Sequence, residues 1–574
     1  MTKVTDIIYK HISKNVSTAY MFSGGSIMSL INNFHNKNNY NKIKYFIPSH
    51  EASAGFCSIG HNKSLNKCDS VIITTSGPGI TNILTPLTDA YSDMVPFLVI
   101  SGDVSTDMMG KHAFQEAPAI ELTKPITYWN YSLLNPNEIH DVMNYAFSLV
   151  NNNKQVHINI PKDILNKSIN ENENLYINKK SIDTIYNYDI NNIINIANII
   201  NNSYKPILYV GKGCIDSSEL IDQLSLKGNI PVTTTLHGLG IFNEKNYNSL
   251  KMVGMHGSIR ANVAIQNSDC IICVGARFDD RTVGNIQKYA PNAKYIIHIN
   301  NDKSVFNKVI LKSINIHGKS KQILSLLINY IDTKNNYDWF NFLQKYPINF
   351  PFNPEKLKQQ HILVILNEEL NKLKEIKKDT IITTGVGNHQ MYAAQLITHM
   401  YPNRFITSGS LGTMGSSNSM AIGAKIANPD KIVISIDGDQ SFNMMNDLKM
   451  IMNYNIGIKI IIMNDSKQSM VNIWEKLFFD NNIVATESIN PNYDLLAKAY
   501  NINCITIDKN MTFDDIRLNI IKFIKYDNNE PIILNCIVES DFCLPLVPPG
   551  NALDDMITYD NINNYIINKS AAPS

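Results

Sequence analysis

Two aspartates in the last third of the chain each follow a hydrophobic run, and their spacing suggests a cation-binding pair. Asp439 follows the run at 432–436, and Asp465 follows the run at 458–463. The segment between them has a helical pattern, so the two strands would lie in one sheet, joined by a right-handed crossover. Protein and phosphate oxygens together commonly bind Mg²⁺, and backbone N–H groups of the turn at 438–441 would face a diphosphate. Two solvated loop acids fit this stretch alone equally well.

An acidic residue and a glycine turn follow two runs in the first part of the chain. Glu51 follows the run at 44–47 and begins a helical segment, where a carboxylate complements the helix dipole. Taken alone, that structural role is favoured over catalysis. The Ser-Gly-Pro-Gly turn at 76–79 opens another helical segment and presents free backbone N–H groups to a ligand. By itself it fits a plain tight turn as well.

These residues follow short apolar runs that alternate with helical segments along the whole chain. Strands are predicted within 44–49, 70–76, 96–102, 155–161, 206–211, 269–275, 294–300, 379–385, 431–437, 457–464 and 531–538. Parallel sheets covered by helices on both faces give this pattern. We therefore predict an α/β protein built from doubly wound parallel sheets, in which ligands bind beyond the carboxyl ends of the strands.

Two polar segments without strand signals, at about 166–187 and 333–355, divide this series into three groups. The predicted domains are 1–166, 188–332 and 356–545, followed by a C-terminal tail at 546–574. Each has the size of an ordinary domain, whereas 574 residues are too many for a single core.

Composition narrows the function classes. The net charge of +1 and the absence of a long basic block argue against a nucleic-acid partner. No apolar run approaches the roughly 18 residues of a membrane-spanning helix. Eight scattered cysteines predict a reducing compartment. Because the N-terminus shows neither a signal peptide nor a long import segment, we expect a cytoplasmic protein, with an organelle left open.

Taken together, the motifs resemble the catalytic large subunit of the acetohydroxyacid synthase (acetolactate synthase) family. The resemblance runs from about residue 5 to about residue 558. It rests on SHEASAGF, TTSGPGITN, HAFQEAP, KPILYVGKGC, LHGLG, VGMHGSIRAN, GARFDDR, TTGVGNHQMYAAQ, SGSLGTMG, IANPDKIVISIDGD and LPLVPPGNALDDMI. GMHG and GARFDDR are specific to this branch of the thiamine-diphosphate (ThDP) enzymes, and chance agreement over the whole set is negligible.

The resemblance implies a fold, cofactors and a reaction. The three domains would bind the pyrimidine of ThDP, FAD, and the diphosphate with Mg²⁺, in that order. The reaction would be decarboxylation of pyruvate and transfer of its two-carbon unit to a second 2-keto acid, pyruvate or 2-ketobutyrate, for branched-chain amino-acid synthesis. In this family the cofactor carries the hard chemistry and the protein supplies orientation and electrostatics.

Site residues follow from the matched motifs. Glu51 would activate ThDP as a general acid–base group, Gly25 would donate its N–H to the developing oxyanion, and Gln115 would line the site. The substrate pocket would include Phe114, Arg281 and Trp474, the last of which narrows the acceptor pocket. A core aromatic on a helix face is the alternative for Trp474.

The cofactor ligands are carried over in the same way. ThDP contacts would be Glu51, Asn388, His389, Gly412, Met414, Gly438, Asp439, Gln440, Ser441 and Met470. The metal ligands would be Asp439, Asp465 and the carbonyl of Lys467. FAD, which the net reaction does not need, would contact Gly211, Gly213, Thr235, Leu236, Met255, His256, Gly257, Gly275, Arg277 and Asp279.

Several positions depart from the family pattern, mostly in motifs that face ThDP. Gln440 stands where the Gly-Asp-Gly turn has its second glycine, and its Cβ costs about 1 kcal/mol if its φ is positive. Asn388 replaces a glutamine, Asp465 replaces an asparagine, and Lys212 interrupts a glycine turn whose extra side chain must find space.

The partners expected from the resemblance are 2-keto acids and at least a second copy of the chain, in a homodimer or homotetramer. The ThDP site of the family lies between the first domain of one chain and the third domain of another. A small regulatory subunit is a common further partner. Two alternatives stay open at this point: another ThDP-dependent carboligase or decarboxylase, and a catalytically inactive homologue.

Overall fold

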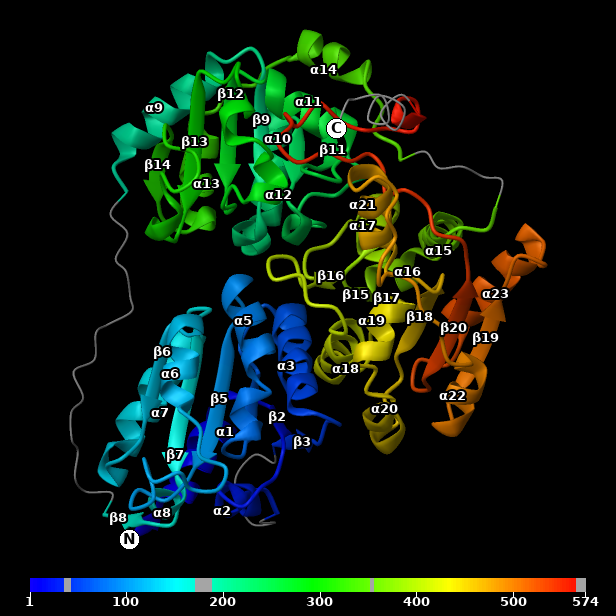
Figure 1. Ribbon diagram of the computed structural model, residues 1–574. Helices are drawn as coiled ribbons and strands as arrows, with labels where there is room; N and C mark the ends of the chain where they lie inside the picture. The colour runs from blue at the N-terminus through cyan, green and yellow to red at the C-terminus, as the bar shows by residue number, and fades with distance from the viewer. Residues whose placement is uncertain (36–42, 171–187, 351–355, 564–574) are drawn as a thin grey trace.

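The computed structural model describes residues 1–35, 43–170, 188–350 and 356–563, which form three α/β domains (Figure 1). The first polar segment and the end of the C-terminal tail lie largely outside these residues. Each domain contains a six-stranded sheet whose paired strands are all parallel, with helices on both faces. The prediction of doubly wound α/β domains is therefore confirmed. No helix in the described part of the chain has the length and apolarity needed to cross a bilayer.

The first domain has the strand order β3-β2-β4-β5-β7-β6. Its strands are β2 (Thr18–Met21), β3 (Lys44–Phe46), β4 (Ser70–Thr74), β5 (Phe97–Asp103), β6 (Trp129–Ser132) and β7 (Gln155–Pro161). One face of the sheet packs on α1 (Val4–Asn15) and α7 (Ile139–Val150), and the other on α3 (Glu51–Leu65) and α5 (Leu84–Ser92). Strands β1 (Thr2–Lys3) and β8 (Ser168–Ile169) form a separate antiparallel pair.

The central domain has the order β11-β10-β9-β12-β13-β14. Its strands are β9 (Pro206–Val210), β10 (Val232–Thr234), β11 (Ser249–Met252), β12 (Cys270–Val274), β13 (Tyr295–Asn300) and β14 (Ile314–His317). Its longer helices are α9 (Ile190–Asn201), α10 (Ser218–Gly228), α11 (Ile259–Asn267) and α13 (Ser320–Leu327). The second polar segment contains one more helix, α14 (Tyr337–Gln344), because the buried Trp339 and Leu343 pack on this domain.

The third domain has the order β16-β15-β17-β18-β20-β19. Its strands are β15 (Thr380–Thr384), β16 (Phe405–Thr407), β17 (Ile432–Gly438), β18 (Lys459–Asn464), β19 (Asn503–Ile507) and β20 (Ile532–Ile537). Its main helices are α15 (Gln359–Lys372), α17 (Asn388–Leu396), α18 (Ser417–Ala427), α19 (Asp439–Met444), α20 (Leu448–Tyr454), α21 (Ser469–Phe478), α22 (Tyr493–Ala499) and α23 (Phe513–Lys525).

Each sheet reverses its winding direction at one point. In the first sheet, the chain places β3 on one side of β2 and then crosses over to place β4 on the other side. The central sheet reverses in the same way between β9 and β12, and the third sheet between β15 and β17. Open α/β sheets bind ligands in the crevice that such a reversal leaves at the carboxyl ends of the strands. The predicted site residues Gly25, Gly211, Gly275 and Asp439 all follow strands that border these points.

Helices α3 and α18 join the first domain to the third, and their backbones are in direct contact. A Cβ added at Gly423 would lie 1.8 Å from the carbonyl oxygen of Cys57, and one added at Gly60 would lie 2.0 Å from that of Met420. Figure 1 shows the two helices side by side between the two sheets. Only glycine permits this approach, so these two residues fix how closely the domains pack.

The C-terminal segment returns from the third domain to the central one (Figure 1). Leu546 and Ile557 pair with each other, and the N–H of Val547 donates to the carbonyl of Met255 at 2.8 Å. Leu553 is fully buried in the central-domain core. The described part of this tail therefore connects two domains.

Candidate active site

The reversal point of the third sheet opens into a cavity with about 410 Å³ of empty space. Most of its lining residues follow β15, β16, β17 and β18, the four neighbouring strands of that sheet, and Gln359 joins them from the start of α15. The predicted ThDP and metal residues among them are Asn388, His389, Met414, Gly438, Asp439, Gln440, Ser441, Asp465, Lys467 and Met470. Gly412 lies in the loop before Met414, where its N–H donates to Ser408 Oγ.

The two aspartates are brought together because β17 and β18 are parallel neighbours, as the sequence predicts. Asp439 is 1% exposed, and burial raises its pKa. Burial, and then repulsion from Asp439, raise the pKa of Asp465 to about 6. None of the ion pairs in the described residues includes either carboxylate. Two buried acids without a cationic partner favour the binding of a cation between them.

Gln440 does not strain the turn. It is the second residue of α19, and its φ is not among the positive values of the described chain. The cost expected for a side chain at this position is therefore absent. Its Nε2 instead donates to Ser488 Oγ at 2.5 Å and to Asn490 Oδ1 at 3.3 Å.

Asn388 and His389, at the start of α17, border the same cavity. Asn388 donates its Nδ2 to the carbonyl of Asp541 at 3.2 Å, while its buried Oδ1 has no partner among the described residues. The His389 ring lies against Gly438, where an added Cβ would be 2.8 Å from Nδ1. A side chain at 438 would displace the His389 ring, and the free amide oxygen of Asn388 is available to a polar ligand.

The first-domain residues Gly25, Glu51 and Gln115 follow strands β2, β3 and β5 of their own sheet. Gly25 has open space where a Cβ would be, so its backbone is accessible. Glu51, at the start of α3, accepts from Asn82 Nδ2 at 2.9 Å. Gln115, whose φ is +62°, packs against Gly77, and the neighbouring Phe114 is 90% exposed.

Within one chain, these first-domain residues do not join the third-domain cavity. Among the described residues, all that line this cavity lie between Gln359 and Val471. Glu51 begins a helix whose flank packs on α18, while Asp439 begins a helix beside β17 and β18. The chain thus carries two partial sites, one on the first domain and one on the third.

Trp474 and Arg281, predicted for the substrate pocket, each contact a residue that packs against one apolar cluster. Trp474 on α21 is half-buried, and its ring contacts Phe478 with a centroid distance of 5.0 Å. Arg281 places Nη1 3.2 Å from the sulfur of Met255. Met255 and Phe478 pack against the same cluster, which includes Ile473 and Leu546. Trp474 is therefore partly exposed, and its two interpretations, as a pocket residue and as a helix-face core aromatic, both stay predictions.

The predicted FAD residues occupy the carboxyl edge of the central sheet. The turns after β9 and β12 are pressed together, because a Cβ on Gly211 would lie 2.4 Å from the carbonyl oxygen of Gly275. His256 is buried, and its Nδ1 has no partner among the described residues. Arg277 donates to the carbonyl of Ser92 at 2.7 Å, and Asp279 caps α12 (Asp280–Val283). Of the other predicted residues, Gly213 and Leu236 lie in the short 3-10 helices Lys212–Ser217 and Leu236–Gly238, and Thr235 and Gly257 lie in loops.

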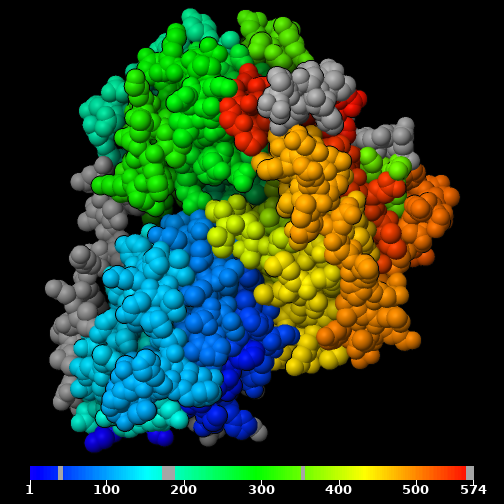
Figure 2. Space-filling view, in the orientation of Figure 1, coloured from blue at the N-terminus to red at the C-terminus, as the bar shows by residue number. Residues whose placement is uncertain are grey.

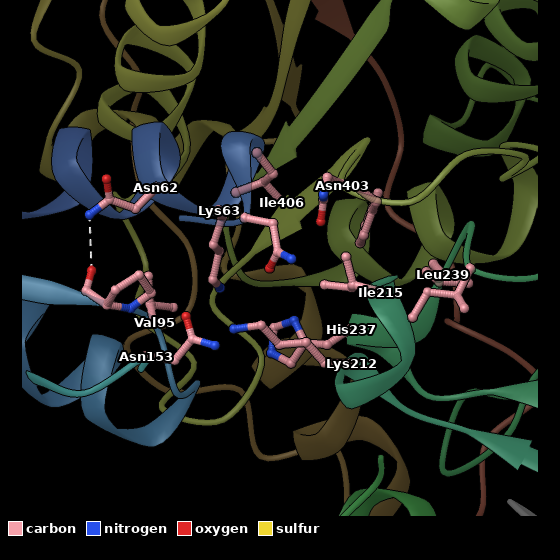
Figure 3. A pocket seen from close by; sticks show the side chains of 14 residues that line it. Asn62, Lys63, Val95, Asn153, Lys212, Ile215, His237, Leu239, Asn403 and Ile406 are labelled. Atoms are coloured by element: carbon pink, nitrogen blue, oxygen red, sulfur yellow. Dashed lines mark hydrogen bonds between the residues drawn. The ribbon is translucent and has the colours of Figure 1, made fainter. Parts of the chain in front are cut away.

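Lys212 finds its space at a second cavity, where all three domains meet (Figure 3). Its Nζ donates to the carbonyls of Asp93 and Met94, at 2.8 and 3.2 Å. Burial, with nearby Lys63 adding to it, lowers the pKa of Lys212 to about 7. The side chain that interrupts the glycine turn is thus directed at the first domain, next to the carbonyl that accepts from Arg277. Figure 2 shows residues of the third domain, in yellow-green, meeting the other two domains at this junction.

Asp93 is the centre of this junction. Its carboxylate contacts Lys63 at 2.7 Å and His237 at 3.0 Å, and it accepts from the N–H of Ser410 at 3.0 Å. Burial alone would raise the pKa of Asp93, but His237 and Lys63 hold it well below its usual range. Nearby, Asp89 accepts from the hydroxyls of Ser408 and Thr413. Both aspartates therefore hold the loop that carries Met414.

Several residues at the site have no motif that sequence analysis could detect. Gln359, at the start of α15, donates to Asp465 Oδ2 at 3.0 Å from more than a hundred positions upstream. Ser466 donates its N–H to Asp439 Oδ2 at 2.5 Å. Asn490 donates its Nδ2 to the same oxygen. They reach the site only through the tertiary fold, so local spacing does not reveal them.

Comparison with known proteins agrees with this arrangement. The N-terminal TPP-binding, central and C-terminal TPP-binding domains of thiamine pyrophosphate enzymes match residues 2–122, 193–327 and 385–536. These matches and the three sheets define a thiamine-diphosphate-dependent enzyme.

The relatives narrow this class further. The catalytic subunit of mitochondrial acetolactate synthase from Saccharomyces cerevisiae is 36% identical, over 95% of this chain and 82% of the relative. The acetolactate synthase large subunit of Cyanidium caldarium is 32% identical, over 96% of this chain and 95% of its own length. Chloroplastic acetolactate synthase of Arabidopsis thaliana is 33% identical, over 97% and 84%. The chain belongs to the acetolactate synthase family.

Proposed function

We propose that this chain is an active acetolactate synthase catalytic subunit, which decarboxylates pyruvate and joins the two-carbon unit to pyruvate or 2-ketobutyrate. The observation that supports it most is the cavity at the reversal point of the third sheet. Two buried acids, a helix start and an unpartnered amide oxygen meet there. This set of groups suits a diphosphate bound through a divalent cation.

Mg²⁺ and ThDP would be held by the third domain. Asp439, Asp465 and the carbonyl of Lys467 would bind the cation, with diphosphate oxygens completing its shell. Two carboxylates and one carbonyl leave coordination positions that phosphate oxygens and water would fill. Met414 would support the cofactor between its two rings. When bound, ThDP supplies the carbon nucleophile and accommodates the charge that decarboxylation leaves.

The first domain would supply the groups that act on protons and on the substrate. Glu51, held by Asn82, would exchange a proton with the pyrimidine ring of the cofactor. The backbone N–H of Gly25 would stabilise negative charge on the substrate oxygen. Gln115 and Phe114 would line the pocket, and Trp474 and Arg281 would limit its size on the acceptor side.

FAD would bind along the carboxyl edge of the central sheet. The unpartnered Nδ1 of His256 and the cationic Arg277 are polar groups that a dinucleotide could satisfy there. In the family FAD contributes no net oxidation or reduction, so its role here would be structural. The flavin absorbance of the purified protein, and its loss on unfolding, test this assignment.

The activity is tested with purified protein, pyruvate, ThDP, Mg²⁺ and FAD, by measuring acetolactate and carbon dioxide. We expect acetolactate from pyruvate alone and acetohydroxybutyrate when 2-ketobutyrate is added. Glu51→Gln should retain ThDP binding, measured by calorimetry, and lose turnover. Absence of saturable ThDP binding to the unmodified chain would reject the proposal.

We also propose that a complete site forms only between two copies of the chain, because the two partial sites lie apart within one copy. Glu51→Ala and Asp439→Ala chains would each be inactive alone. After the chains are mixed and allowed to exchange subunits, a mixed dimer has one intact site, so about a quarter of normal activity should return. No recovery, despite exchange shown by mass spectrometry, would place both halves of the site in one chain.

Two finer assignments accompany this proposal. The yeast relative is named a catalytic subunit, and a separate regulatory subunit is a candidate partner of this chain. Co-purification from the source organism tests it. Cytoplasmic location is the expectation from the sequence, and cell fractionation distinguishes it from an organelle.

A further inference from the structure

The segment after α21 folds back onto the carboxyl edge of the third sheet, where Asp439 and Asp465 lie. The N–H of Gln468 donates to Thr486 at 2.8 Å, and that of Ser488 donates to Ser466 at 3.0 Å. Lys467 and Glu487 add an ion pair of 2.8 Å between the same two segments. This pairing brings Asn490, far from Asp439 in the sequence, to the carboxylate expected to bind the metal.

Asn490 contacts that carboxylate and the groups around it through both ends of its amide. Its Nδ2 donates to Asp439 Oδ2 at 2.5 Å and to Asn464 Oδ1 at 2.8 Å. Its Oδ1 accepts from Gln440 Nε2 at 3.3 Å and from Asn443 Nδ2 at 3.2 Å. One side chain thus connects the carboxyl ends of β17 and β18 with the short helix α19.

The chemistry of the partners determines the orientation of this amide. An ionised carboxylate only accepts hydrogen bonds, so Asn490 must direct its NH₂ group to Asp439. The amide oxygen is then directed at Gln440 and Asn443, both of which must donate. The same Nε2 of Gln440 also donates to Ser488 Oγ, whose hydroxyl is compatible with this orientation.

The carboxylate of Asp439 is fixed by these contacts. Oδ2 accepts from Asn490 and from the N–H of Ser466, whereas Oδ1 accepts from the N–H of Gln440. Residues that hydrogen-bond to a metal ligand without touching the metal orient that ligand. Removal of such a residue typically lowers metal affinity ten- to a hundredfold. A glycine at position 440 would remove one of the two donors that hold Asn490.

From these contacts we propose that Asn490 is a positioning residue for Asp439, and that the Gln440 side chain acts through Asn490. This inference rests on the proposed Mg²⁺–ThDP site. Gln440, which departs from the glycine of the family turn, thus has a role that glycine cannot supply.

The test is calorimetric titration with ThDP at a series of Mg²⁺ concentrations, which gives the Mg²⁺ concentration at half-maximal binding. Asn490→Ala should raise that concentration about tenfold or more, and Gln440→Gly about fivefold, the effect of one hydrogen bond. Because Gln440 acts through Asn490, the double variant should match Asn490→Ala. Asn371→Ala is the matched control, since it removes a half-buried asparagine of the same domain that bonds Asn367 instead.

A change below twofold in Asn490→Ala, or effects of the two variants that multiply, would overturn the inference. Tighter binding in Gln440→Gly would overturn it as well. If Asn490→Ala does not fold, Gln440→Ala provides the same test from a half-exposed helix position. Failure of the unmodified chain to bind ThDP would instead reject the proposed function, so the two failures are distinguishable.

Discussion

Replacement of Gly423 by alanine should force the first and third domains apart. The new Cβ would lie 1.8 Å from the carbonyl oxygen of Cys57, and real Cβ contacts are essentially never shorter than 3.0 Å. Helices α3 and α18 would therefore separate by at least 1.2 Å at this point. Neither atom can move by rotating a side chain, because the obstacle is backbone.

The loss in free energy of unfolding caused by Gly423→Ala should lie at the upper end of the range for overpacking. Added methyl groups in close-packed cores cost about 1–3 kcal/mol, and both helices are almost entirely buried here. We expect about 3 kcal/mol, which lowers the melting temperature of a domain of this size by about 6 °C or more. Since Glu51 begins α3, the displacement should also reduce turnover.

Thermal unfolding followed by circular dichroism measures the change. Gly60→Ala, which would meet the carbonyl of Met420 at 2.0 Å, should behave in the same way. Ala427→Ser adds one atom at the end of α18 and serves as the control. A melting temperature of Gly423→Ala within about 1 °C of the unmodified protein would refute the backbone contact between the two helices.

Three further changes test individual contacts. Trp474→Leu should lower the preference for 2-ketobutyrate over pyruvate as acceptor, measured from the ratio of the two products. Asn82→Ala should reduce kcat about fivefold, because Glu51 loses a hydrogen bond worth about 1 kcal/mol. Lys212→Met should change the pH dependence of stability. The folded pKa of Lys212, about 7, lies below its ordinary value of 10.5, so the unfolded chain binds more protons between these values and the stability due to Lys212 rises with pH.

Each of these three predictions would be contradicted by a specific result. An unchanged product ratio would remove Trp474 from the acceptor pocket. Full activity in Asn82→Ala would mean that Glu51 does not depend on this contact. For Lys212, urea unfolding at pH 7 and pH 10 should show the unmodified chain gaining stability over Lys212→Met as pH rises, and a constant difference would exclude the lowered pKa.

The sequence predicted most of the longer strands well. All the apolar runs named in advance contain strands, because uninterrupted Ile and Val runs such as 431–437 are typical of buried parallel strands. The strands it missed, such as β10 and β16 with three residues each and β19 with five, contain no uninterrupted apolar run. Helix α14 was missed because its polar neighbours hide the buried Trp339 and Leu343.

For the site, the sequence placed Asp439 and Asp465 together because both follow neighbouring strands, and that placement is confirmed by the sheet order. It could not place Asn490 or Gln359, which approach from remote segments. It also treated Gln440 and Lys212 as losses relative to glycine. In the structure both side chains make new contacts, which only the surrounding fold could reveal.

The junction at Asp93 has a consequence for how the chain assembles. Its carboxylate, which is completely buried, is matched by His237 of the central domain and by the N–H of Ser410 in the third. If only two of the domains dock, Asp93 keeps its ion pair with Lys63 of its own domain but loses either His237 or the N–H of Ser410. Partly docked chains are therefore disfavoured, and interdomain docking should proceed as one cooperative step.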